Sequence, residues 1–264
     1  MTDVWANFQY LRQDSAKSGF IMQDHGQETI YLGSYHTKRM YVQDARHQTT
    51  RFSLDEQGFS LLNSPALIQD HMDEEMTITS LYYPHISTLL SESLQAEKVI
   101  IIDHTLRSSA PTSDLRRTAT HVHNDYTAAS CLQRLQDSVG NTQAKAWSNR
   151  RLIQVNTWQP LMEPVTVAPL GLLDGSSVVI DDLVPSPIIY PDRRGEIYSV
   201  RHNPNHRWYY FSQMRRDEIL LFKGFDSADS GQVKFTPHAA FQHPDSKPDD
   251  PPRRSIEVRA LVMI

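Results

Sequence analysis

Apolar residues recur at helical spacing in two segments near the middle of the chain. In the first segment they share one face of a helix for which Pro84 suits the first position: Ile86, Leu89, Leu90 and Leu94. In the second, over residues 127–139, they again share one face: Ala128, Cys131, Leu132 and Leu135. Gly140 follows this segment directly and marks its expected end.

Elsewhere, short apolar runs separated by Pro, Gly and Asp are typical of strands. The predicted strands cover residues 29–32, 39–42, 59–62, 98–103, 151–158, 178–180, 188–190, 208–211, 218–222, 232–235 and 256–263. Many short strands with few helices predict a mainly β protein with flanking helices. The expected architecture is a β-sandwich or jelly roll with the helices packed outside.

The length of 264 residues, with 39% hydrophobic and 22% charged residues, suits a single domain over 1–264 with a substantial core. We expect residues 1–65 to form an N-terminal cover without chemistry, and residues 98–264 to form the jelly-roll core. Between them, acidic residues favour the start of a helix: Asp70, Asp73, Glu74 and Glu75.

The charge and the cysteine content narrow the function. A net charge of −5 argues against nucleic acid or an anionic membrane as the main partner. Cys131 is the single cysteine, which excludes an internal disulfide framework and a cysteine-based zinc site. No secretory signal and no apolar run of membrane-spanning length is present, so we expect a soluble cytoplasmic protein. The formation of a homo-oligomer is possible.

The strongest candidate for chemistry is a histidine two residues before an aspartate. Residues two apart on an extended strand point to the same side, so His123 and Asp125 would aim an imidazole and a carboxylate at one point. One further histidine from elsewhere would complete the 2-His-1-carboxylate triad that holds Fe(II). The alternative is a polar pair at the end of a strand.

Three other stretches carry candidate residues. His238 stands alone in an apolar context, where a buried structural histidine is the commoner case. Arg253 and Ser255 share a strand face and could bind one carboxylate together, although an arginine–glutamate ladder on the surface is the alternative. Asn156 and Trp158 share another face and could line a cavity or fill the core.

These stretches stand in an order that resembles a known family. The matching segments are DHTLR at 103–107, VHND at 122–125, NTWQP at 156–160, DLVP at 182–185, NHRWYY at 205–210, DEILLFK at 217–223, FDS at 225–227 and residues 252–262. Together they are similar to the AsaB-type hydroxylase/desaturase family of specialised metabolism, whose relatives include gibberellin desaturase-like proteins and the accessory chain of the cephamycin methoxylase. The similarity runs from about residue 80 to the end.

The resemblance implies a double-stranded β-helix and Fe(II)/2-oxoglutarate chemistry with O2 on a small-molecule substrate. It assigns the metal to His123, Asp125 and His238, and the co-substrate to Arg253 and Ser255. The remaining co-substrate candidates are Asn156 and Arg259, with Arg259 as the alternative anchor. Four further residues are candidates for the substrate pocket: His121, Trp158, Tyr209 and Tyr210.

Some assignments have rivals. His121 could replace His123 as a ligand, and His206 or His202 could replace His238. A zinc hydrolase with a His-x-His-x-Asp-His signature is the rival enzyme, but Tyr126 stands where its last histidine belongs. An accessory subunit that keeps the fold and depends on a partner for turnover is the non-enzymatic rival.

Overall fold

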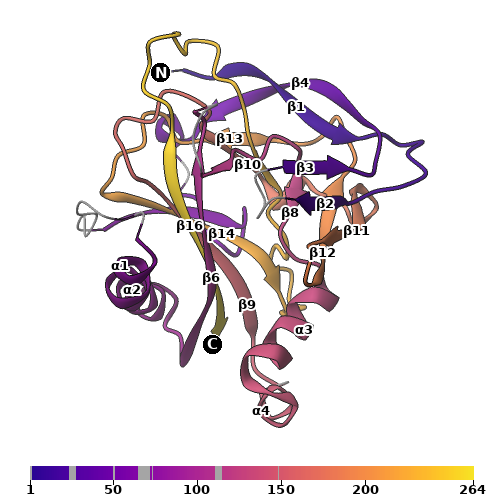
Figure 1. Ribbon diagram of the computed structural model, residues 1–264, viewed down its shortest axis with the longest axis vertical. Coiled ribbons are helices and arrows are strands. Elements are labelled where there is room, and N and C mark those ends of the chain that lie inside the picture. The colour runs from indigo at the N-terminus through magenta and orange to yellow at the C-terminus, as the bar shows by residue number, and fades with distance from the viewer. Residues whose placement is uncertain are drawn as a thin grey trace.

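Strands make up most of the regular structure in the computed structural model, which describes residues 2–23, 28–49, 51–64, 72, 74–110, 115–147 and 149–264. They form two sheets (Figure 1). In spatial order, the larger sheet contains β1 (Val4–Leu11), β4 (Tyr35–Asp44), β13 (Trp208–Tyr210), β10 (Leu170–Leu173), β15 (His238–Ala240), β8 (His123–Asn124), β12 (Arg194–Val200), β11 (Leu183–Ile189), β2 (Phe20–Gln23) and β3 (Glu28–Tyr31). The smaller sheet contains β5 (Phe59–Asn63), β14 (Glu218–Asp226), β9 (Leu152–Pro160), β16 (Arg254–Met263), β6 (Lys98–Ser108) and β7 (Arg116–Arg117).

The two sheets face each other as the layers of a jelly roll, so the predicted fold class is confirmed. Trp158 and Phe222 of the smaller sheet pack against Leu170 and Leu172 of the larger one, between the layers. Burying an aromatic or aliphatic side chain of this size stabilises the fold by about 1.5–3 kcal/mol each. The same inward-facing rows also carry the polar residues of the site.

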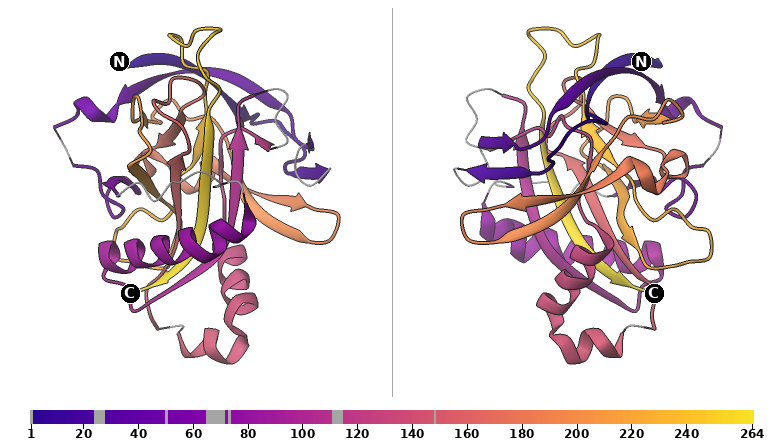
Figure 2. Two further views of the ribbon diagram at one scale, coloured as in Figure 1. Left: turned by 60° about the vertical axis from the view of Figure 1, so that its left-hand side comes forward. Right: turned by 90° about the vertical axis from the view of Figure 1, so that its right-hand side faces the viewer.

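Helices cover the outer face of the smaller sheet. A continuous helical segment comprises α1 (Glu75–Thr77), a π-helical turn (Ile78–Tyr82) and α2 (Tyr83–Leu94). Ile86 and Leu90 of α2 are buried against outward-facing residues of β16 such as Val258, and the helix crosses that sheet (Figure 2). α2 begins at Tyr83, so Pro84 stands within its first two positions in agreement with the prediction, although the helical segment as a whole begins earlier, at Glu75.

The predicted acidic helix start is confirmed at Glu75, while Asp70 and Asp73 lie outside the described residues. The second predicted helix is also confirmed. α3 (Ala128–Val139) begins after Thr127, whose hydroxyl accepts a hydrogen bond from the Ser130 N–H, and α4 (Asn141–Ala146) follows. One residue of the predicted apolar face is not buried: Leu132 is exposed, whereas Cys131 and Leu135 are buried.

Two predicted strands are absent from the described residues. Residues 178 and 179 join the short 3-10 turns Gly175–Ser177 and Ile180–Asp182. Asp174 and Asp182 accept hydrogen bonds there from backbone N–H groups that a strand would use for pairing. Residues 232–235 are held instead by single contacts such as Val233 N–H to Asp55 O at 3.0 Å. In these two segments the apolar runs therefore do not indicate strands that pair within a sheet.

The N-terminal segment is built into both sheets. β4 pairs with β1 on one side and with β13 on the other. A short 3-10 turn, Ala45–His47, follows it. β5 pairs with β14 at the edge of the smaller sheet. Among the described residues, no helix is both long and apolar enough to cross a membrane.

Candidate metal and co-substrate site

Three candidate ligands from two distant segments of the chain meet between the two sheets. β8 is only two residues long, and it pairs with β15 so that His123 lies directly opposite His238. Asp125 follows β8 at once. One nitrogen or oxygen from each of these three side chains lies within 4.8 Å of the others. The expected pairing of His123 with Asp125 thus occurs next to His238.

Both histidines present the same ring nitrogen to this point. His123 Nδ1 lies 2.8 Å from the backbone oxygen of His121, and His238 Nδ1 lies 3.2 Å from that of Thr236. A carbonyl oxygen can only accept, so each Nδ1 carries the proton and each Nε2 keeps a lone pair for a metal. Burial lowers the pKa of His238 to about 3, which keeps it neutral.

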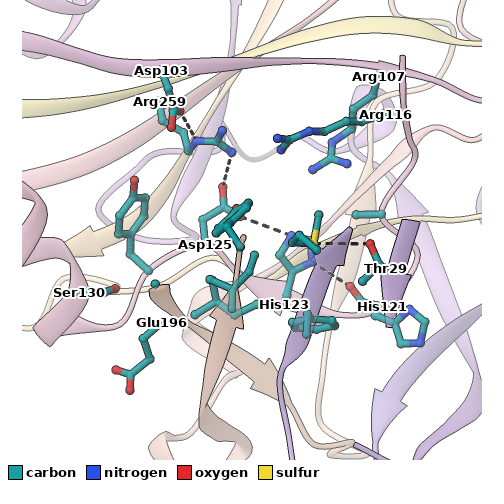
Figure 3. A pocket seen from close by; sticks show the side chains of 18 of the residues that line it. Thr29, Asp103, Arg107, Arg116, His121, His123, Asp125, Ser130, Glu196 and Arg259 are labelled. Carbon is teal, nitrogen blue, oxygen red and sulfur yellow. Dashed lines mark hydrogen bonds and ion pairs between the residues drawn. The ribbon is translucent and has the colours of Figure 1, made fainter. Parts of the chain in front are cut away.

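The aspartate is oriented by its neighbours. Asn156 donates to Asp125 Oδ2 at 2.7 Å, and Arg259 Nη1 lies 3.6 Å from the same oxygen. Asp125 Oδ1 is left facing His123 Nε2 at 3.4 Å (Figure 3). Burial acts to raise the pKa of Asp125, but His123, Arg259 and His238 outweigh it and hold that pKa well below its usual range.

Arg259 and Asn156 therefore lie behind the ligands. Arg259 donates to Asp103 Oδ1 at 2.6 Å, to Thr105 Oγ1 at 2.7 Å and to Glu257 Oε1 at 3.1 Å. With its donors engaged in this way, Arg259 positions the ligand carboxylate. Asn156 does the same, and Gln154 in turn donates to it at 2.6 Å.

Asn124, which the sequence did not single out, ties the ligand segments together. Its Nδ2 donates to the backbone oxygens of Tyr126 and Gly224, each at 2.7 Å. Its Oδ1 accepts from the Thr236 N–H at 3.1 Å, two residues before His238. Its place between His123 and Asp125 is the one signal of it in the sequence, while its partners Gly224 and Thr236 are distant along the chain.

A small inner cavity opens beside the triad. Its lining comprises Arg107, Ala119, His123, Trp158, Leu170, His238, Ala240, Arg253 and Glu257. Arg253 is 1% exposed, stacks 5.4 Å from the Trp158 ring and donates to Ala168 O at 2.8 Å. Within the described residues, Arg253 Nε and Ser255 Oγ are buried without a hydrogen-bond partner. A buried cation and hydroxyl left in this state call for an anionic ligand.

A cavity of about 830 Å³ opens on the other side of His123 and Asp125. This volume suits a drug-sized molecule. The N-terminal segment, from which we expected no chemistry, contributes Phe20, Met22, Thr29 and Tyr31 to its lining. His121 also lines it, with its ring stacked 3.7 Å from that of Tyr31.

The rival and remaining candidates lie elsewhere. His206 is held between Tyr10 and Asp182, each 3.1 Å from one of its ring nitrogens, and His202 packs against the Tyr10 ring. Tyr209 packs on Phe52 and Phe59, and Tyr210 packs on Phe241 and His243. The described linings of the two cavities include Trp158 and His121 of the four predicted pocket residues.

The chain is similar to known proteins over most of its length. A family model described as an oxidoreductase/YMDC permease-like domain matches residues 8–263. The hydroxylase/desaturase efuI of Hormonema carpetanum is 31% identical over 96% of this chain and 92% of its own length. The Fe(II)/2-oxoglutarate-dependent dioxygenase nvfI of Aspergillus novofumigatus is 29% identical over 83% of this chain and 81% of its own length. A solved variant of the iron and alpha-ketoglutarate-dependent endoperoxidase NvfI aligns with a TM-score of 0.88 at 25% identity, over 100% of this chain and 98% of that one.

Proposed function

The chain belongs to the family of Fe(II)/2-oxoglutarate-dependent hydroxylases and desaturases, and we propose that His123, Asp125 and His238 hold its iron. The predicted reaction class and cofactors are confirmed at the level of the family: an oxygenase that uses Fe(II), 2-oxoglutarate and O2 on a small molecule. The observation that carries the ligand assignment is the convergence of two unprotonated Nε2 atoms and one carboxylate oxygen.

The donor set fits the proposed metal. Two imidazole nitrogens and one carboxylate oxygen suit Fe(II), whereas thiolates or an all-oxygen set would favour other ions. Asp125 offers Oδ1 to the metal because Asn156 and Arg259 engage Oδ2. This contact favours binding through a single oxygen, which leaves coordination positions for co-substrate and O2.

The unpartnered donors at the inner cavity suit a carboxylate of 2-oxoglutarate. Arg253 and Ser255 would bind its distal carboxylate through Nε and Oγ, the two buried atoms described above. When iron, 2-oxoglutarate and O2 are bound, decarboxylation to succinate and CO2 supplies the oxidant that removes hydrogen from a substrate C–H bond. Trp158 shields the carboxylate site and excludes water from it.

The larger cavity would hold the primary substrate against His123 and Asp125. Its mixed lining of aromatic, aliphatic and charged side chains suits a natural-product intermediate. Hydroxylation or desaturation then depends on how the substrate radical lies relative to the metal.

The test compares His238→Ala with His206→Ala for iron content and for succinate formed from 2-oxoglutarate without primary substrate. We expect the first variant to lose both properties and the second to keep both. A His238 variant that holds iron and makes succinate, beside an inactive His206 variant, would reverse the assignment. Zinc-dependent hydrolysis, or turnover that requires a partner protein, would support one of the two rival functions.

A further inference from the structure

The inner cavity carries a second guanidinium group that the ligand assignments above do not use. Arg107 and Arg253 both line it. Among the residues that the structure describes, no carboxylate lies within ion-pair distance of either group. The one carboxylate in the lining, Glu257, accepts from Asn156 at 3.3 Å and from Arg259 at 3.1 Å. Arg253 is buried and Arg107 is half-buried, so two like charges share this cavity without a counter-charge of their own, which is unfavourable for Arg253 unless an anion binds.

The charge of Arg107 opposes that of Arg253. Burial and the charge of Arg107 lower the pKa of Arg253 to about 9. An anion with a negative charge near each guanidinium would remove this repulsion. A dicarboxylate has that distribution of charge.

Arg107 occupies a different place in the cavity from Arg253. It lies on β6 opposite Ser255 of β16, and its Nη1 donates to Arg117 O at 2.8 Å. Arg107, Ala119 and His123 appear in the linings of both cavities, whereas Arg253 lines the inner one. Arg107 therefore stands at the junction next to a proposed metal ligand, with Arg253 farther inside. In Figure 3 its side chain points into the space above His123.

We propose that Arg107 binds the carboxylate at the metal end of 2-oxoglutarate, while Arg253 and Ser255 bind the distal carboxylate. This inference rests on the proposed function. It makes Arg107 a binding residue for the 2-oxo acid group, common to every acid of that type. Arg253 recognises the second carboxylate and so selects 2-oxoglutarate among such acids.

The neighbouring residue Arg116 supplies a matched control. It pairs in register with Arg107 on β7 and lies beside it in the larger cavity. Its side chain carries the same charge, but the described lining of the inner cavity does not include it. Replacement of Arg116 thus changes the local charge without removing the proposed contact.

The experiment measures binding of two ligands to iron-loaded protein under anaerobic calorimetry: 2-oxoglutarate, and 2-oxopentanoate, which lacks the distal carboxylate. Loss of a charge-assisted contact should weaken binding by about 10- to 100-fold. We expect Arg107→Gln to weaken both ligands by the same factor and Arg253→Gln to weaken 2-oxoglutarate alone. Arg116→Gln should weaken neither. Arg107→Lys, which keeps the charge, should show a smaller loss that is again equal for the two acids.

The other outcomes are separable. If Arg107→Gln or Arg107→Lys weakens 2-oxoglutarate but not 2-oxopentanoate, Arg107 acts at the distal carboxylate and the inference is wrong. If both Arg107 variants bind the two acids as the wild type does, Arg107 serves the primary substrate or the fold. If wild-type protein with iron binds neither acid, the proposed function itself fails.

Discussion

Two clusters of buried charge in this molecule differ in how they are neutralised. In the first, Asp226 accepts two hydrogen bonds from Arg151, at 2.6 and 3.1 Å, and also contacts the ammonium group of Lys223. Lys223 further donates to Asp55 Oδ1 at 3.2 Å and to Val233 O at 2.9 Å. Each buried charge here has a partner, so the cluster holds β14 to its surroundings.

The inner cavity shows the opposite condition. Arg253 is as buried as Lys223, yet no carboxylate of the described residues forms an ion pair with it, the charge of Arg107 opposes its own, and Ser255 Oγ is unsatisfied. A charge that the fold satisfies contributes to stability, and a charge that the fold leaves unsatisfied awaits a ligand. The difference separates structural from functional polar groups in the same core.

Among changes at the candidate site, replacement of the metal ligands should have the largest effect on activity. We expect His123→Ala and Asp125→Ala each to abolish iron binding and iron-dependent turnover, because each removes one of three donors at a single point. Metal analysis and circular dichroism together check this result. Normal iron occupancy in either folded variant would remove that residue from the triad.

Asp226→Asn should have the largest effect on stability. Removal of the carboxylate leaves the buried Lys223 and the half-buried Arg151 with the exposed Asp55 as their shared carboxylate partner, so the loss should approach that of a broken buried pair, about 3–5 kcal/mol. Chemical denaturation measures the loss, and the exposed pair Arg215–Asp217 supplies the control, since Asp217→Asn should leave the transition unchanged. Affinity for iron should stay normal in the folded fraction of Asp226→Asn, as the comparison of the two regions requires.

The same cluster should give the protein a characteristic sensitivity to acid. Burial acts to raise the pKa of Asp226, but Arg151 and Lys223 outweigh it and the pKa is lowered. A lowered carboxyl pKa contributes stability above the unfolded value of about 3.9, and this contribution is lost as the pH falls through the folded value. The Asp226→Asn variant should lack this part of the acid transition.

Arg253→Ala should have an intermediate effect, confined to the co-substrate. Loss of a bidentate contact should cost about 1.5–3 kcal/mol, so that the KM for 2-oxoglutarate rises far more than that for the primary substrate. Arg259→Ala should instead weaken iron, since Arg259 holds Asp125 and Glu257. Normal 2-oxoglutarate binding in Arg253→Ala, with loss in Arg259→Ala, would mean that the wrong arginine was assigned.

His121→Ala should have the smallest effect. Its ring stacks on Tyr31 and lies edge-on to Tyr35, and its contact with His123 is made by its backbone oxygen, which the substitution keeps. Iron affinity should therefore change by less than the roughly tenfold that loss of an orienting contact costs. A complete loss of iron would indicate that His121 is itself a ligand.

The sequence was most informative where side-chain direction follows from a strand. Alternation places Arg253, Ser255, Glu257 and Arg259 on the inner face of β16, with Ile256 and Val258 on the outer face. The arginine–glutamate ladder considered as the alternative does have one pair, since Arg259 donates to Glu257 at 3.1 Å, but this pair lies inside the sandwich, where Glu257 is 5% exposed.

Residues brought in by long-range pairing could not be predicted in the same way. Arg107 reaches the inner cavity because β6 pairs with β16, and Tyr31 reaches the larger cavity because β3 and β2 join the far edge of the other sheet. Neither of these strand pairings leaves a pattern in the sequence near the residue concerned. Asn124 likewise depends on Gly224 and Thr236, which lie 100 and 112 residues farther along the chain.

Anaerobic titration of the purified protein with Fe(II) and then with 2-oxoglutarate tests the central claim most directly. The account predicts a weak visible charge-transfer band that requires both additions and saturates near one equivalent of each, and that is absent when zinc replaces iron. Tight binding of zinc with hydrolytic activity and no such band, or no response to 2-oxoglutarate by iron-loaded protein, would contradict it.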